Sequence, residues 1–520
     1  MKLIIVHYHL RAGGVRRVIE LATPHLCRAA KVDSLVLACG EAMDQNWNEA
    51  MVRRAAPAHV EFFIEPAFRY VSEQRHSPAR LRPRIASAVH RLLNGSTERD
   101  CIVWAHNLGI ARNLLLSHSL ANACKHHGVP LIAHHHDWWF DNRWLRWPEM
   151  QRCGIRDLAA AARTIFPATK TIHHVAINRA DSVVLHRHFQ QRAHWLPNLA
   201  ERATPPAPKR IREARHWLKD HVGDGNNPVW ILPCRLLRRK NIAEALLLAR
   251  WLRPEACLVT TGGASSKDEQ RYAEKLAAAA RHHDWPLRLG ILAHDQRHKP
   301  SMAELVAASE CVMLTSMQEG FGLPYLEAAA ANRPLIARVL PNIAPDLAKF
   351  GFRFPQSYKE ILVHTDLFNW SSERARQEKW FHRWKRQLPM ALRRRAEHPA
   401  LLAAQSQPAA VPFSRLTLDA QIEVLAQPAE QSWKLCAPLN GFLSVWKRRA
   451  GNEALQVTPW PRIANDWLSG ESYAERFLKI RRQHPSSSPT VPDALAAQED
   501  FFEKNLAAAN SYPLLWNSDV

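Results

Sequence analysis

The stretch ECVMLTSMQEGFGLPYLEAAAANRPLIARV, residues 310–339, predicts a strand, a turn, a helix and a second strand. ECVMLTS and RPLIARV are short apolar runs typical of buried strands. Between them, Pro324 suits a first helical turn, and the alanines 328–331 are strong helix formers. A helix that connects two buried strands in this way indicates a parallel sheet covered by helices.

The same alternation of strand and helix patterns runs through most of the chain. It begins at KLIIVHY (2–8), stops at the Pro-rich segment NLAERATPPAPKR (198–210) and restarts at VWILPC (229–234). We therefore predict an α/β protein with two Rossmann-like doubly wound domains that face a central cleft. In such sheets, ligands bind beyond the carboxyl ends of the strands.

The pattern also suggests domain boundaries. We expect an N-terminal Rossmann-like domain at 1–198, a linker at 199–228 and a C-terminal Rossmann-like domain at 229–355. A helical segment at 356–430 should pack back on the fold. Residues 431–520 are expected to form an extension. We assign no role to it, because it contains no recognisable catalytic or binding motif.

The composition narrows the class of protein. The 520 residues carry a formal net charge of +22, which implies an anionic partner: nucleic acid, an anionic membrane surface or phosphorylated small molecules. The nine cysteines include no CxxC pair, and their odd number argues against a disulfide framework. With no signal peptide and no apolar run of about 20 residues, we expect a cytoplasmic protein.

The turn in the opening stretch has the features of an anion site. Gly320 and Gly322 allow the backbone to approach a ligand closely, and the helix that follows directs its first N–H groups at the turn. Glu319 precedes the turn and Glu327 follows it on the helix, so that one carboxylate can lie on each side of a bound phosphate. A tight turn with two solvated glutamates is the alternative, but the complete string favours the ligand site.

EGFGLPYLEAAAANRPLIA resembles the E-x7-E signature of retaining, nucleotide-sugar-dependent glycosyltransferases of the GT-B fold (family 4, group 1). The resemblance implies that Glu319 contacts the donor sugar and Glu327 the ribose. The backbone N–H groups of the turn would bind the sugar and the diphosphate; the turn consists of Gly320, Phe321, Gly322 and Leu323. It also implies that residues 1–198 are the acceptor side and that residues 229–355 bind the nucleotide sugar.

Two further motifs agree with this family. LPCRLLRRKN places Arg235 and Lys240 at the family's Arg-x4-Lys spacing, where the two cations neutralise the leaving diphosphate. HYHLRAGGVRRVIE resembles the family's first glycine loop, in which Gly13 and Gly14 approach the donor phosphate. Taken alone, RLLRRK would be a solvated basic stretch.

The segment HHHDWWFDNRWLRW, residues 134–147, allows several interpretations. An H-x-H pair at a strand end can bind zinc, but no E-x-x-H or CxxC accompanies it, and we predict no metal site. The resemblance instead places His136 against the donor sugar. His106 ends the preceding strand, where it either lines the cleft or is a satisfied strand-end histidine. The tryptophans suit sugar stacking, a membrane interface or packing, and we expect packing for at least two of them.

We therefore expect a metal-independent retaining glycosyltransferase of the hexosyltransferase type (EC 2.4), with a nucleotide diphosphate sugar as co-substrate and no cofactor. The alternatives are a GT-B relative that acts as a sugar-nucleotide hydrolase, phosphorylase or epimerase, a catalytically dead scaffold, and a basic nucleic-acid- or membrane-binding protein. The chain has no recognisable nucleic-acid-reading module, so nucleic acid is the less favoured partner. The sequence identifies neither the base, the sugar, the acceptor nor the oligomeric state.

One segment bears on membrane association. PARLRPRIASAVHRLL (78–93) predicts a basic amphipathic helix in the N-terminal domain. Such a helix suits peripheral binding to anionic lipid on the inner face of the membrane, and an ordinary basic helix face is the equal alternative.

Overall fold

The computed structural model describes residues 1–11, 13–200, 202, 204–222, 227–264, 266–293, 299–483 and 489–516, without the side chains of residues 267 and 268. The chain divides into two compact units. Unit 1 comprises residues 1–201, 387–395 and 462–505, and unit 2 comprises residues 202–386, 396–461 and 506–520.

Unit 1 is built on a seven-stranded sheet in the order β3-β2-β1-β4-β5-β6-β7, in which all pairings are parallel. Its strands are β1 Lys2–Val6, β2 Ser34–Cys39, β3 His59–Ile64, β4 Cys101–His106, β5 Leu131–His135, β6 Ile172–Ala176 and β7 Ala193–Trp195. The strand order reverses between β1 and β4, the kind of switch point at which doubly wound sheets bind ligands.

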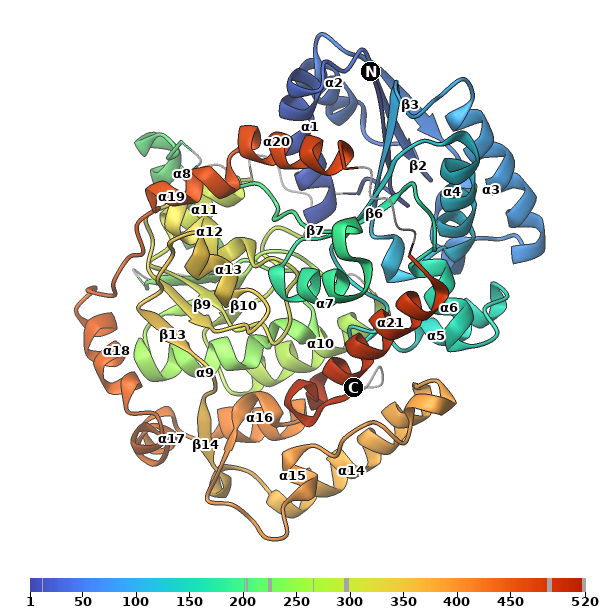
Figure 1. Cartoon of the computed structure of the whole chain (residues 1–520). Helices are drawn as coiled ribbons and strands as arrows, with labels where there is room; N and C mark the ends of the chain where they lie inside the picture. Colours follow the sequence, from blue (N-terminus) through green and yellow to red (C-terminus); the bar gives the residue numbers. More distant parts are fainter. Residues whose placement is uncertain are drawn as a thin grey trace. The chain divides into compact units, whose positions relative to one another are not determined.

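Helices cover this sheet. Those between the strands are α1 Gly14–Ala29, α2 Gln45–Ala55, α3 Pro78–Leu93, α4 Leu114–His127, α5 Arg146–Arg152, α6 Leu158–Ile165 and α7 Arg179–Phe189. Three more come from the end of the chain: α19 Arg462–Leu468, α20 Gly470–Arg481 and α21 Val491–Leu506. Figure 1 shows α20 beside α1, and α3 beside α4. The first pair packs so closely that a Cβ on Gly470 would lie 2.1 Å from the His25 ring.

Unit 2 contains a six-stranded parallel sheet in the order β10-β9-β8-β11-β12-β13. The strands are β8 Val229–Leu232, β9 Cys257–Thr260, β10 Leu287–Arg288, β11 Cys311–Leu314, β12 Leu335–Arg338 and β13 Gln356–Tyr358. Its first helices are α8 Pro208–Val222, α9 Ile242–Leu252, α10 Lys267–His282, α11 Met302–Ala308, α12 Leu323–Ala330 and α13 Ala344–Lys349.

The later part of unit 2 is mainly helical. It contains α14 Trp370–Gln387, α15 Ala400–Ala403, α16 Leu418–Ala426, α17 Ala429–Cys436 and α18 Phe442–Gly451, with β14 Leu362–His364 paired antiparallel to β15 Ala410–Pro412. Helices α16, α17 and α18 pack against α9, the buried helix that follows β8 (Figure 1).

The predicted α/β class with two Rossmann-like doubly wound domains and helical C-terminal segments is confirmed. Several segments differ in detail from the expected boundaries. The expected linker contains α8, and the expected extension at 431–520 supplies α19, α20 and α21 to unit 1. The pattern of an amphipathic helix shows which of its faces is buried, but not against which sheet. The sequence therefore could not predict that these helices pack in unit 1.

Two further observations bear on the composition. All nine cysteines are buried and unpaired, and each lies in the described part of the chain. Among the described residues, no helix combines the length and the apolar character that crossing a membrane requires.

Unit 1 buries an unusual number of histidines near the carboxyl ends of its strands. His135 and His174 lie side by side on β5 and β6, with Nε2 of His135 3.2 Å from Nδ1 of His174. Burial lowers the pKa of His174 to about 3, with a smaller contribution from His173. His174 is therefore neutral in the folded protein at any pH above about 3.

This burial predicts a pH-dependent stability. The unfolded chain binds a proton at His174 below its ordinary pKa of 6.5, whereas the folded chain does not bind one until about pH 3. The free energy of unfolding should therefore fall as the pH falls from 6.5 towards 3, by up to about 1.4 kcal/mol per pH unit for each such histidine. Urea unfolding at pH 7.5, 6 and 5 measures this slope.

His174→Gln should reduce the slope. The exposed His59, on β3, provides the control: His59→Gln should keep the slope of the parent protein. Equal slopes for the parent protein and His174→Gln would contradict the assignment.

Candidate active site

The motif residues of unit 2 lie beyond the carboxyl ends of two neighbouring parallel strands, β8 and β11. The loop after β8 ends in a short 3-10 helix, Arg238–Lys240, and two contacts tie it to the loop after β11. The Thr315 hydroxyl donates to the Lys240 carbonyl (2.9 Å), and the Met317 N–H donates to the Arg239 carbonyl (2.8 Å). Segments more than 70 residues apart in the chain are thereby held together.

Glu319 is the centre of this arrangement. Its Oε1 accepts from the Lys240 ammonium and from the Ser316 hydroxyl (2.6 Å), and its Oε2 pairs with Nη1 of Arg239 (2.9 Å). Burial alone would raise the pKa of Glu319, but Lys240 and Arg239 outweigh it and lower the pKa to about 2. Glu319 is therefore a fixed carboxylate at any physiological pH.

The turn after Glu319 leads directly into α12. Gly322 adopts φ 77°, and a Cβ there would lie 2.9 Å from Cδ2 of Tyr325, so this position requires glycine. Phe321 is buried, Leu323 begins the helix, and the helix has no side-chain N-cap among the described residues. Its first N–H groups can therefore bind an anion. Glu327 lies half-buried farther along α12.

Arg235 occupies a different position from Lys240 on the same loop. Its side chain is exposed and lies against the backbone of Gly262, where a Cβ would come within 3.0 Å of Cγ of Arg235. The structure thus joins Lys240 directly to Glu319 and leaves Arg235 at the surface. Such an exposed guanidinium is free to turn towards a ligand.

In unit 1, Gly13 and Gly14 form the N-terminus of α1. Gly13 is the N-cap and Gly14 the first helical residue, and both are exposed. Among the described residues, this terminus has no side-chain cap and no acidic residue in its first turn. It therefore has the features that an anion site at a helix N-terminus requires.

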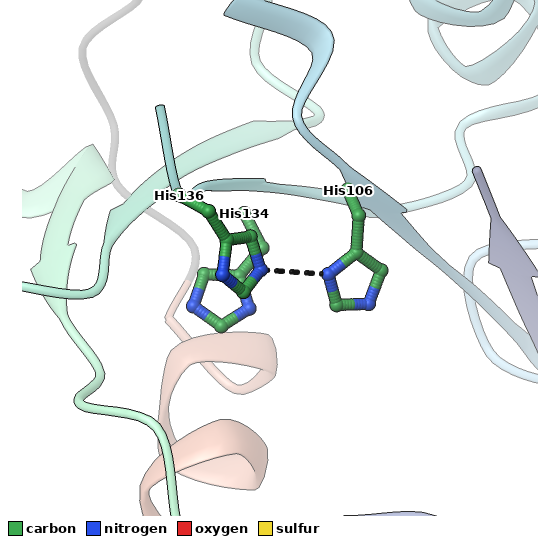
Figure 2. A group of neighbouring side chains, drawn as sticks. All are labelled: His106, His134 and His136. Carbon is green, nitrogen blue, oxygen red and sulfur yellow. Dashed lines mark hydrogen bonds between the residues drawn. The ribbon is translucent and has the colours of Figure 1, made fainter. Parts of the chain in front are cut away.

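The two predicted histidines contact each other. His106 ends β4 and is fully buried, and its Nδ1 lies 2.9 Å from Nε2 of the partly buried His136 (Figure 2). Asn107, in the left-handed region at φ 59°, accepts at Oδ1 from the N–H groups of His136 (2.8 Å) and Asp137 (3.1 Å). Burial lowers the pKa of His136 to about 4, so its imidazole is neutral at physiological pH.

The tryptophans after His136 belong to the core. Trp138, Trp139 and Trp144 are each at most 1% exposed. They pack beneath α21, with ring centroids 5.0 Å apart for Trp138 and Phe501 and 5.7 Å apart for Trp139 and Phe502. The expectation that at least two tryptophans serve packing is confirmed, and these three are not a sugar-binding surface.

Sequence reasoning missed three residues that complete these arrangements: Arg239, Ser316 and Asn107. Arg239 stands in the quoted RLLRRKN, but only the 3-10 turn shows which of its cations reaches Glu319. Asn107 follows the strand-end His106, yet its left-handed backbone and its two bonds to the next strand end leave no sequence signal.

Comparison with known proteins finds a family match for part of unit 2. Residues 215–353 match the family of glycosyl transferases group 1. This range contains the loop after β8, the turn after β11 and helix α12, and therefore every motif residue of unit 2. This segment is therefore similar to group 1 glycosyltransferases.

Two curated relatives are enzymes of Petrotoga mobilis. The chain is 24% identical to mannosylglucosyl-3-phosphoglycerate synthase over 353 residues, 66% of this chain and 65% of that protein. It is 22% identical to mannosylglucosylglycerate synthase over 294 residues, 51% of this chain and 65% of that protein. The matches thus span about 65% of the length of each relative.

Solved structures of glycosyltransferases align along most of the chain. One is HepE of Anabaena in complex with UDP-glucose, with a TM-score of 0.48 and 16% identity over 92% of this chain and 98% of that one. Another is a glycosyltransferase of Rickettsia africae, with a TM-score of 0.49 and 12% identity over 92% of this chain and 97% of that one.

The ion pair of Lys240 with Glu319 predicts a strong energetic coupling. Glu319→Gln leaves the ammonium of Lys240, which is 8% exposed, without its carboxylate. We expect the free energy of unfolding to fall by about 3 kcal/mol, because an unpaired buried charge is costly. Urea denaturation measures this change.

Lys240→Met provides the second arm of a double-mutant cycle. The double variant Glu319→Gln/Lys240→Met should be more stable than the sum of the two single effects allows, because neither charge then remains alone. Additive effects would show that the pair contributes no coupling.

Proposed function

We propose that this chain is a retaining glycosyltransferase that moves a hexosyl group from a nucleotide diphosphate sugar to an acceptor. The observation that carries the proposal is the ion pair of Lys240 with Glu319 at the start of α12, inside the matched glycosyltransferase domain. It combines a fixed carboxylate, a buried cation and a helix N-terminus within one short loop.

Glu319 is suited to bind hydroxyl groups of the donor sugar. A carboxylate offers about four acceptor positions, and Lys240, Arg239 and Ser316 account for three of them. One position remains for a sugar hydroxyl. Because the neighbouring cations hold the carboxylate in place, it needs no reorganisation when the donor binds.

The leaving diphosphate is proposed to be stabilised by the cations of the β8 loop and the helix amides. Lys240 and the exposed Arg235 supply positive charge, and the N–H groups from Gly320 to Leu323 supply hydrogen bonds. Glu327 would bind the ribose, as the family resemblance implies. The proposed transfer uses no metal for the leaving group, since the cationic side chains perform that role.

The residues of unit 1 are proposed to complete the reaction. Gly13 and Gly14 would approach the donor phosphate at the N-terminus of α1, and the fully buried His106 would act on the donor site through its contact with His136. The neutral imidazole of His136 would accept or donate one hydrogen bond at the donor sugar. Attack on the face that the diphosphate leaves gives retention, with a phosphate oxygen taking the proton of the acceptor.

A donor-binding experiment tests this proposal first. UDP-, GDP- and ADP-sugars are added separately to the protein, and its thermal unfolding is recorded. We expect one nucleotide class to raise the Tm of the parent protein, because a ligand that binds only the folded state stabilises it. The rise should be lost in Arg235→Ala and in Glu327→Ala.

The exposed Arg53 of α2 offers a matched control, since Arg53→Ala removes a cation of unit 1 away from the motifs and should keep the shift. The anomeric configuration of the product, observed by NMR, then tests retention. Sugar released without an acceptor would indicate a hydrolase, and no shift with any donor would contradict the proposal.

We also propose electrostatic contact of α3 with anionic lipid. Its apolar residues, among them Leu81 and Ile85, are buried in unit 1, whereas Arg80 and Arg82 are exposed. The helix therefore has no apolar face to insert, and only its charges can act, at about 1 kcal/mol per basic residue near the surface.

Co-sedimentation with phosphatidylglycerol vesicles should show binding at low salt that disappears at high salt. Arg80→Glu/Arg82→Glu should weaken it, and neutral phosphatidylcholine vesicles should bind no protein. Absence of binding to anionic vesicles at low salt would remove this proposal.

A further inference from the structure

Three histidines of unit 1 converge on one point. His106 and His134 are paired across the adjacent parallel strands β4 and β5, and His136 follows two residues after His134. Side chains two residues apart in an extended segment point to the same face. One ring nitrogen from each histidine lies within 4.8 Å of the others. The three ring centroids lie 4.6–5.5 Å apart, and Figure 2 shows the three side chains gathered at one place.

The cluster is not satisfied by its own hydrogen bonds. Nε2 of His106 and Nε2 of His134 are buried without a hydrogen bond among the described residues, although the Leu196 backbone lies close enough to His134 to offset part of the lowering of its pKa. A buried polar atom without a partner costs about 1–3 kcal/mol, so the cluster has bonding capacity left for a ligand. A metal on Nε2 of His106 would use this capacity directly, whereas a metal on Nδ1 would leave the ring proton on Nε2. Burial also keeps the imidazoles neutral, which is the form that binds metals.

The donor set selects the chemistry of the ligand. Three imidazoles suit zinc, copper, iron or nickel, and not calcium or magnesium, which prefer oxygen. Nδ1 of His106 and Nε2 of His136 are 2.9 Å apart, whereas two nitrogens on a tetrahedral Zn²⁺ lie roughly 3.3 Å apart at Zn–N distances of about 2.0–2.1 Å. A displacement of a few tenths of an ångström suits this pair to the ion. The separations within the cluster extend up to 4.8 Å, so the third imidazole would have to approach by up to roughly 1.5 Å.

We propose that His106, His134 and His136 form a binding site for one divalent transition-metal ion of the Zn²⁺ class. This departs from the prediction from sequence that the chain has no metal site, because the strand pairing that brings His106 to the H-x-H segment is a tertiary feature. Three protein ligands leave a fourth position for solvent or an anion.

Two neighbouring side chains form hydrogen bonds with residues of the cluster, one with His136 and one with His134. Asn107 fixes the backbone of His136 through its side-chain oxygen. The Trp104 indole N–H donates to Nδ1 of His134 (3.2 Å) and thereby competes with the metal. If the metal takes Nδ1, it displaces the indole, and if it takes Nε2, the ring proton must move to Nδ1. Removing the indole N–H should therefore strengthen metal binding.

The site does not depend on the proposed transfer reaction. The metal and the donor sugar would compete for the imidazole of His136. The metal site and the donor site can still be tested separately, because each has its own binding measurement. The metal is tested by its own binding, and the donor site by nucleotide-sugar binding to metal-free protein.

The experiment is a titration of the full, chelator-treated chain with Co²⁺, followed by its visible absorption, with Zn²⁺ as the competitor. The 28 histidines include surface ones, so the informative quantity is the difference between variants. We expect the parent protein to bind one Co²⁺ with a tetrahedral spectrum. His106→Gln and His136→Gln should each lose that equivalent or bind it at least about 100-fold more weakly.

His174→Gln is the matched control, because it removes a buried histidine from the middle of β6, in the same sheet but outside the cluster, and should keep the equivalent. Trp104→Phe should bind Co²⁺ more tightly than the parent protein. Circular dichroism confirms folding, and the partly buried His136 provides a variant if the buried His106 cannot be replaced. Equal binding by the folded parent protein and His136→Gln would overturn the proposal.

Discussion

The buried carboxylate of Glu319 is the constraint on which the arrangement of unit 2 depends. An ionised carboxylate can be buried only where cations and hydrogen-bond donors replace its water. Lys240 and Arg239 come from the loop after β8, and Ser316 comes from the end of β11. Because β8 and β11 are neighbours in the sheet, their carboxyl ends deliver these groups to one place.

A second buried network lies in the same unit. Arg338, at the end of β12, pairs with the fully buried Glu244 of α9 (2.5 Å), and the Tyr358 hydroxyl donates to the same carboxylate (2.5 Å). This network joins the helix after β8 to the ends of β12 and β13. Unit 2 therefore holds two sets of fixed charges at the carboxyl ends of its strands, and such fixed dipoles and charges are what a site for a phosphorylated ligand needs.

The buried polar groups of unit 1 include neutral histidines in place of paired charges. Its strand ends carry imidazoles that burial keeps neutral, as in His106, His134 and His174. A neutral imidazole has one donor and one acceptor, so a histidine pair satisfies only part of its own bonding capacity. Ring nitrogens without partners are the result. In unit 2, by contrast, the buried carboxylates of Glu319 and Glu244 are paired with cations.

The fold and the motif residues of unit 2 could be predicted because they lie in continuous local patterns. The buried strand, the glycine turn and the helix start fall within residues 310–339, and their order alone specifies a parallel βαβ unit. Arg239 could not be assigned, because RLLRRK offers four cations and only the 3-10 turn Arg238–Lys240 decides which of them face Glu319.

Packing was expected for at least two of the tryptophans, but the residues that they pack against could not be predicted from the sequence. Trp138 and Trp139 lie in a loop, and the residues that bury them, Phe501 and Phe502, are more than 350 positions away on α21. That helix is anchored by a charged contact as well, since Lys504 pairs with Asp181 (3.1 Å), whose other oxygen accepts from the Trp138 indole (3.0 Å). From the neighbouring sequence alone, these aromatic side chains could be exposed. They are part of a core because helix α21, distant in the sequence, packs against them. The last helix of the chain thus closes the core beneath the loop that carries His136, and the position of that histidine depends on residues that no local pattern connects to it.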